Sequence, residues 1–386
     1  MKVIRFVFAL VLFLISLLAI IPAPNYDAWE LSIVVTELGW IIALASLLVF
    51  LPGWWRTALG RLAAGLGFAA FVLSLSPILR ALPIARALPS RLQTAFGDTT
   101  AKSLPGAAAR SKSFVGRDWI IGIHKEKVRH DSFGYLAGDG ERLGIDLYRP
   151  LNSGEALPLV VMIHGGSWRG GTRAELAALN PYLAARGYAV ASIDYRLAPK
   201  FPHPAASQDV DRAIRFLKAN SSQLQLDPSR IVLVGRSAGG QLALLHAYTA
   251  NDPSIRGVVA FYAPSDQNYG YEHPSNPRVI NSIDVLEKFL AGNPKTVPAA
   301  YHDASPVNFV SGSTPPTLLI HGVKDELVSV HQSERLDSAL AQSGRSHLFL
   351  RFPWATHGCD YFINGPCGQI STYAIERFLA AVLKQN

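Results

Sequence analysis

Six short apolar runs, separated by segments with helical periodicity, constrain the fold of this chain more than any other feature. In one helical segment Val210, Ala213, Ile214 and Leu217 recur at i, i+3, i+4 and i+7. Apolar strands that alternate with amphipathic helices are typical of a parallel sheet covered on both faces. With two more strands expected near 127–130 and 142–148, we predict an α/β domain over residues 119–386 with a mostly parallel sheet of eight strands. The six runs are 157–164, 188–194, 230–235, 256–262, 316–321 and 348–352.

The first 84 residues read as a membrane region. Apolar stretches cover 6–21, 31–51 and 62–79, and a helix needs about 20 apolar residues to cross a bilayer. We expect two or three transmembrane helices, with Glu37 facing a neighbouring helix. The first stretch could instead be a secretory signal, but the cleavage pattern around residues 21–23 is poor, so we expect it to be retained.

The positive charge of the chain is concentrated after these stretches. Residues 80–118 hold seven Lys or Arg against two Asp, whereas the whole chain has a net charge of +8. We read 85–118 as a basic juxtamembrane linker that contacts anionic membrane lipids. No basic face with interleaved aromatic residues indicates a nucleic-acid partner.

The side of the membrane on which the domain lies depends on the number of spans. Lys2, Arg5, Arg56 and Arg61 favour an inner N-terminus and an inner second loop. Three spans then place the domain outside the plasma membrane, which we expect, although the basic linker argues for the inner side.

One turn between an apolar run and a helical segment carries the chemistry. The sequence there is Gly-Arg-Ser-Ala-Gly-Gly, residues 235–240, a G-x-S-x-G pattern. Gly235 and Gly239 allow a tight turn that would expose the hydroxyl of Ser237 above the sheet. We predict that Ser237 is a nucleophile; the alternative is a glycine-rich turn with an N-capping serine.

A nucleophilic serine needs a base and an acid that orients the base. Asp325 follows the run 316–321 and His357 follows the run 348–352, so both should lie at the same sheet edge as Ser237. Alone, each could be an N-capping aspartate or a surface histidine. Asp303 and Asp360 are weaker candidates for the acid.

The loop after the run 157–164 supplies an expected oxyanion hole. Backbone N–H groups that point at a developing oxyanion stabilise it, and glycines let the backbone approach. We expect donors from Gly166, Ser167 and Ala238, with Gly165 shaping the turn and His164 ordering the loop rather than binding a metal.

Together these residues resemble the hormone-sensitive-lipase-like branch of the α/β-hydrolase esterases, over roughly residues 120–386. The resemblance implies carboxylic ester hydrolysis without a metal or cofactor. The chain departs from the family at Ser167, where a glycine is usual, and at Arg236, where an acidic residue or His is more frequent. The motifs that carry it are the loop 164–168, the Tyr-Arg-Leu-Ala-Pro stretch 195–199, the turn 235–240, the H-G-x-x-D segment 321–325 and the H-G pair 357–358.

The sequence leaves the roles of several residues near the motifs undecided. Arg236 would pair with an acid or attract an anionic substrate. Residues 263–300 read as a cap over the site. Cys359 and Cys367 could form a disulfide or stay free. Aromatic residues that could line a substrate pocket with Arg236 are Trp168, Trp354 and Tyr361.

The sequence thus predicts a membrane-anchored serine carboxylesterase or lipase that acts on small-molecule or lipid esters, and its place at a bilayer favours lipophilic ones. A peptidase or amidase, an acyltransferase and a catalytically inactive scaffold remain alternatives on the same fold. The sequence indicates no oligomeric state.

Overall fold

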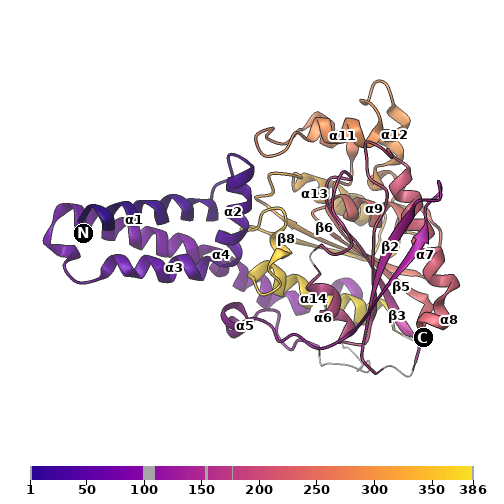
Figure 1. Ribbon diagram of the computed structural model, residues 1–386, viewed down its shortest axis with the longest axis horizontal. Helices are drawn as coiled ribbons and strands as arrows, with labels where there is room; N and C mark the ends of the chain where they lie inside the picture. The colour runs from indigo at the N-terminus through magenta and orange to yellow at the C-terminus, as the bar shows by residue number, and fades with distance from the viewer. Residues whose placement is uncertain (1, 99–108, 153–154, 176, 385–386) are drawn as a thin grey trace.

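The computed structural model describes residues 2–98, 109–152, 155–175 and 177–384 (Figure 1). Its sheet has eight strands in the order β1-β2-β4-β3-β5-β6-β7-β8. The strands β3 to β8 pair in parallel, and β2 pairs antiparallel with both β1 and β4. This confirms the predicted α/β-hydrolase sheet. The bounds are β1 Arg129–Leu136, β2 Arg142–Arg149, β3 Leu157–Ile163, β4 Ala189–Ile193, β5 Leu226–Arg236, β6 Ile255–Phe261, β7 Thr317–Gly322 and β8 His347–Phe352.

Helices cover both faces of the sheet, because the central strands are apolar on both sides. One face packs against α7 (Ala205–Ala219), α8 (Ser221–Leu224), α9 (Ala238–Thr249) and α13 (His331–Gln342). The other packs against α6 (Leu179–Ala184), α14 (Pro366–Val382) and the end of α4 (Ala58–Phe96). The four residues of the periodic pattern, Val210 to Leu217, are all buried in α7. Shorter helices are α5 (Gly116–Ile121), η4 (Pro306–Phe309) and η5 (Cys359–Tyr361).

The segment predicted to be a cap lies between β6 and β7. It contains α10 (Gln267–Glu272), α11 (Ser282–Leu290) and the start of α12 (Pro298–Asp303). These helices lie beyond one edge of the sheet in Figure 1. They therefore stand over the strand ends that carry the candidate catalytic residues.

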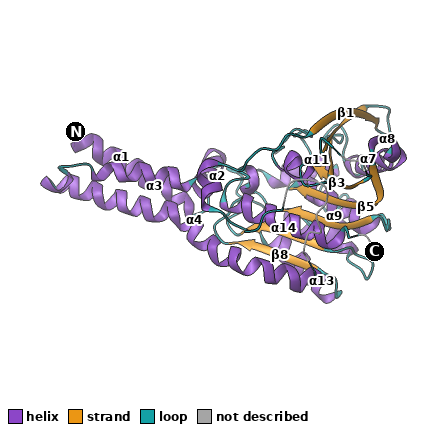
Figure 2. Ribbon diagram, turned by 90° about the horizontal axis from the view of Figure 1, so that it is seen from below, coloured by secondary structure: helices purple, strands orange, loops and turns teal. Residues whose placement is uncertain are grey.

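A three-helix bundle projects from the sheet domain (Figures 1 and 2). It consists of α1 (Lys2–Ser16) with η1 (Leu17–Ala19), α3 (Gly39–Leu47) with η2 (Leu48–Phe50), and the first part of α4, which follows η3 (Trp54–Arg56). The N-terminus lies at the far end of the bundle. By length and composition α1 with η1 and α4 could each cross a membrane, and the bent pair of α2 (Tyr26–Glu37) and α3 would be a third span.

The length of the second apolar stretch suggests one straight helix, but the structure divides the stretch into two helices. The chain bends by 79° between α2 and α3, and α2 lies across the base of the bundle against the sheet domain (Figure 2). The carboxylate of Glu37 explains this position. It accepts hydrogen bonds from the backbone N–H of Cys367, at 2.8 Å, and from Trp354 Nε1, at 3.3 Å. The helix that Glu37 faces is thus α14, at its N-terminus, where the first N–H groups lack partners within the helix.

The predicted linker is largely part of the folded domain. Residues 85–96 continue α4, and Leu88 and Leu92 are fully buried in the sheet domain. Three basic side chains of the linker and its approach donate to protein groups: Arg80 to Pro353 O, Arg91 to Phe349 O and Arg110 to Gln369 Oε1. These three residues thus have partners within the protein, contact of the stretch with lipid headgroups stays a prediction, and its part at 99–108 lies outside the described residues.

Candidate active site

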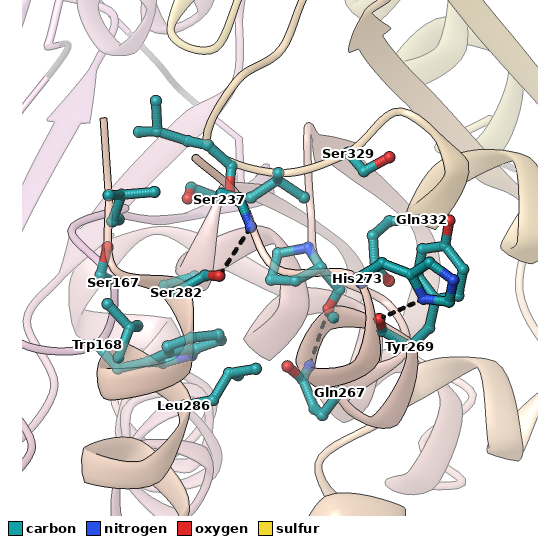
Figure 3. A pocket seen from close by; sticks show the side chains of 18 residues that line it. Ser167, Trp168, Ser237, Gln267, Tyr269, His273, Ser282, Leu286, Ser329 and Gln332 are labelled. Carbon is teal, nitrogen blue, oxygen red and sulfur yellow. Dashed lines mark hydrogen bonds between the residues drawn. The ribbon is translucent and has the colours of Figure 1, made fainter. Parts of the chain in front are cut away.

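The turn after β5 holds Ser237 in a left-handed backbone conformation. Its φ is 52° and its ψ is −121°, a strained geometry for a residue other than glycine. Its N–H donates to Phe261 O at 2.9 Å. A Cβ atom on Gly235 would lie 2.1 Å from Gly239 O, so the turn can close only with glycine there. The side chain of Ser237 lines a pocket under the cap (Figure 3).

Asp325 and His357 meet at the same edge of the sheet. Asp325 follows β7 and His357 follows β8, and His357 Nδ1 lies 2.7 Å from Asp325 Oδ2. The other carboxylate oxygen, Oδ1, accepts the N–H groups of Leu327 and Val328. Burial raises the pKa of the Asp325 carboxyl, but His357 and His321 together outweigh burial and lower that pKa to about 2. The carboxylate is therefore charged over the whole physiological range.

His321 is a second imidazole on this carboxylate, and the sequence analysis gave it no role. Its Nε2 lies 3.1 Å from Asp325 Oδ2 and 2.9 Å from Val328 O, and its Nδ1 lies 2.8 Å from Ser333 Oγ. With two acceptors at Nε2, this nitrogen carries the proton and Nδ1 accepts from the serine hydroxyl. His321 thus holds Asp325 in place. The H-G-x-x-D pattern contained it, four positions before the acid.

A buried network joins the loop of Ser237 to the loop of His357. Arg236 Nε lies 2.5 Å from Asp360 Oδ2, and the hydroxyl of Tyr262 donates to Asp360 Oδ1 at 2.6 Å. The ring of Tyr262 lies 4.2 Å from that of His357 between centroids. Asp360, which we had considered as a weaker acid, pairs here with Arg236. In the described part of the chain, no hydrogen bond joins Ser237 Oγ to His357.

The loop after β3 packs directly on this turn. A Cβ on Gly165 would be 3.4 Å from Ser237 Cβ, so the two backbones touch. Gly166 has a φ of 106° and Ser167 a φ of 56°, a left-handed course that aims the loop at the pocket. Among the described residues, the N–H groups of Gly166, Ser167 and Ala238 have no protein acceptor. Three donors near Ser237 are therefore open to a ligand oxygen.

His164 lies behind this loop. Its ring stacks on Tyr195, 4.2 Å apart, and its Nδ1 lies 2.7 Å from Gly165 O. Burial lowers its pKa, so it is neutral. The hydroxyl of Tyr195 donates to His164 O. The contacts agree with a residue that orders the loop.

The pocket beside Ser237 is narrow, with a cavity volume of about 60 Å³. Trp168 forms one wall and stacks on Phe289 at 4.0 Å. Figure 3 shows Leu286, Gln267 and Tyr269 of the cap around the same space. Residues of the segment 263–300 thus supply much of the pocket lining.

Three residues that we expected in the pocket do not line it. Arg236 pairs with Asp360 on the other side of the turn. Trp354 is fully buried and donates to Glu37. Tyr361 is 61% exposed. Each side chain follows the packing of its own loop, which sequence proximity to a motif does not reveal.

Cys359 and Cys367 form a disulfide with a Cα–Cα distance of 5.7 Å. It connects η5, which follows His357, to the first turn of α14. Among the described residues, no cluster of three or more His, Cys, Asp or Glu side chains could hold a metal ion.

The sheet domain is similar to known esterases. The profile of the BD-FAE family matches residues 145–340. Esterase LipC of Mycobacterium tuberculosis is 32% identical over 278 residues, which are 67% of this chain and 66% of LipC. Esterase LipQ of the same organism is 30% identical over 66% of this chain and 63% of LipQ. The chain thus matches just under two thirds of each relative's length.

The fold is also that of solved esterases. The structure of a bacterial heroin esterase superposes with a TM-score of 0.58 at 24% identity, and covers 68% of this chain and 87% of that one. At this identity the likeness concerns the fold alone.

Proposed function

The chain belongs to the BD-FAE family and is related to hormone-sensitive-lipase-like esterases, and on that premise we propose that it is a serine hydrolase of carboxylic esters held at a membrane. The observation that carries this proposal is the buried Asp325–His357 hydrogen bond at the sheet edge where the strained turn presents Ser237. The named esterase relatives support the same reaction class.

In the proposed reaction Ser237 Oγ attacks the ester carbonyl while His357 takes its proton. Asp325 fixes the imidazole with Nδ1–H toward the carboxylate and stabilises the imidazolium. The open N–H groups of Gly166, Ser167 and Ala238 bind the oxyanion. His357 then gives the proton to the leaving alcohol, and an acyl-enzyme on Ser237 remains. Water, activated by His357, releases the acid and restores Ser237. The hydrogen bond from Ser237 Oγ to His357 that this step needs forms when substrate binds.

The bundle supports attachment to a membrane. Its 18 residues from Lys2 to Ala19 would span about 27 Å as a helix, close to the roughly 30 Å of a hydrocarbon core. Large apolar side chains are exposed along all three helices, among them Ile4, Val11, Leu44 and Phe68. Water solvates such an apolar surface poorly, whereas the acyl chains of a bilayer would cover it.

The charges favour an outer location for the catalytic domain. Arg5 Nη2 donates to Pro52 O, so the N-terminus and the loop before α4 lie together at the far end of the bundle (Figure 1). The basic residues Lys2, Arg5, Arg56 and Arg61 gather there, which the positive-inside rule places in the cytoplasm. The catalytic domain at the other end then lies outside. Arg80, Arg91 and Arg110 of the basic stretch donate to protein groups, which weakens the argument of that stretch for the inner side.

Labelling of the full chain in detergent with a fluorophosphonate tests the proposal. We expect a covalent adduct on Ser237 and hydrolysis of p-nitrophenyl acetate. Ser237→Ala should abolish the adduct and lower kcat by about three or more decades. Ser222→Ala, an exposed serine on α8, is the matched control and should behave as the parent chain does. An unlabelled parent chain, or activity retained in Ser237→Ala, would refute the assignment.

A further inference from the structure

The connection between α1 and α2 rests on the active site. We call residues 18–29 the portal segment. It contacts the loop of the acid, the loop of the base and the cap. Its hydrogen bonds are Lys324 Nζ to Leu18 O, Ala23 N to Glu326 Oε1 at 2.7 Å, Asn276 Nδ2 to Pro24 O at 3.2 Å, Tyr26 N to Arg278 O at 3.1 Å, and Trp29 Nε1 to His357 O at 3.2 Å.

An open groove runs between the portal segment and the cap. Its cavity volume is about 620 Å³, larger than that of the pocket beside Ser237. Pro22 and Ala23 of the portal segment and Pro274 and Asn276 of the cap line it, together with apolar Val323 and Val330 and polar Glu326 and His331. The groove and the pocket share four lining residues: Tyr269, His273, Ser275 and Ser329. The two hollows therefore adjoin, and a ligand could occupy both.

The proposed reaction assigns each hollow to one half of the ester. His357 must reach the leaving alcohol to give it a proton, so the alcohol lies on the side of His357. The portal segment contacts the backbone of His357, and the groove is lined by Asp325. The acyl group then lies beside Ser167 and Trp168, in the narrow pocket. The sizes imply a short acyl group and a large alcohol.

The outer end of the groove lies where the bundle meets the catalytic domain. Ile20 and Ile21 directly precede its wall and are 46% and 44% exposed. They continue the exposed apolar surface of α1, on which Val11 and Leu14 also lie. If lipid surrounds the bundle, an apolar chain can pass from the bilayer along these exposed apolar residues to the groove.

We propose that the groove between the portal segment and the cap seats the apolar alcohol of a short-chain ester that resides in the membrane. This inference rests on the proposed esterase function. It makes the N-terminal region part of the substrate site, with Pro22 and Ala23 as residues that determine the choice of alcohol.

The test compares two acetate esters on the full chain in detergent micelles. Pro22→Phe fills the groove from the portal side and Asn276→Phe from the cap side; both side chains are exposed. Pro52→Phe is the matched control. It makes the same proline-to-phenylalanine change as Pro22→Phe, but in the loop at the far end of the bundle. We expect each groove variant to lower kcat/KM for hexadecyl acetate by about tenfold or more, with less than about twofold change for p-nitrophenyl acetate. Pro52→Phe should match the parent chain on both.

Equal loss on both substrates, or no loss, in both groove variants would overturn the proposal. A selective loss on p-nitrophenyl palmitate rather than hexadecyl acetate would overturn the assignment of the groove to the alcohol. Failure of the parent chain to hydrolyse p-nitrophenyl acetate would instead refute the esterase function itself, so the two failures are distinguishable.

Discussion

The indole N–H of Trp29 donates to the backbone carbonyl of His357 at 3.2 Å, across 328 positions of sequence. The ring of Trp29 also lies 6.5 Å from that of His357 between centroids. A side chain at the base of the proposed membrane bundle thus holds the loop that carries the proposed general base. The N-terminal region is thus a structural part of the catalytic domain as well as the proposed membrane anchor.

Trp29→Phe should therefore lower turnover without loss of substrate affinity. The change removes one hydrogen bond, worth about 1 kcal/mol, and keeps most of the ring. If the bond positions His357 for proton transfer, kcat should fall about fivefold while KM stays near its parent value. Steady-state kinetics on p-nitrophenyl acetate measure both. Trp55→Phe, in an exposed residue of η3, is the control; a rise in KM with constant kcat would contradict a positioning role.

The pH dependence of activity should report one proton on the acid side. The pKa of Asp325 is lowered to about 2, so its carboxylate contributes charge above that pH and loses it only as the pH falls through 2. Asp325 therefore contributes no titration step in mild acid. A plot of log kcat/KM against pH should have a slope of about one there. A slope of two would show that Asp325 titrates in the same range.

His321→Leu should impair the role of Asp325 in catalysis, in addition to any loss of fold stability. The substitution removes the Nε2 hydrogen bond to Asp325 and leaves Ser333 to find another partner. Because His321 helps to lower the pKa of Asp325, that pKa should rise, and kcat should fall about tenfold. His321→Gln, whose amide can still donate to Asp325, should recover part of the loss. Equal losses in both variants would indicate a packing role only.

Ser167→Gly tests whether the departure from the family's loop matters. The residue has a φ of 56°, which glycine adopts without strain, and the backbone N–H is retained. Activity on p-nitrophenyl acetate should stay within about twofold of the parent chain. A loss of tenfold or more would mean that the hydroxyl of Ser167 takes part in binding.

The elements that local pattern defines could be predicted from the sequence. Asp325 and His357 each follow an apolar run, and parallel strands bring their carboxyl ends to one edge, so their meeting followed from strand order. The turn around Ser237 was also predictable, because close backbone contacts leave no room for a Cβ atom at Gly235 and Gly239.

Contacts between distant parts of the chain could not be predicted in this way. The stretch 31–51 is apolar throughout, and nothing in its period marks the bend at Leu38. The bend follows from Glu37, whose partner Cys367 lies 330 positions away. Likewise Trp354 is close to His357 in sequence but packs toward Glu37. An apolar helix has the same sequence pattern whether lipid or protein covers it, so the burial of α4 against the sheet domain was missed.

The ion pair of Arg236 and Asp360 should show strong coupling between its two sites. Both side chains are buried, with Nε and Oδ2 2.5 Å apart. Removal of one partner leaves a buried charge without its counterion, which costs about 3–5 kcal/mol. Arg236→Met and Asp360→Asn should therefore each lower Tm markedly in detergent. The double variant leaves no unpaired charge, so its loss should be well below the sum of the two. Additive losses would contradict the coupling. Since Asp360 also accepts from Tyr262, which packs on His357, kcat should fall in Asp360→Asn even at temperatures where the variant is fully folded.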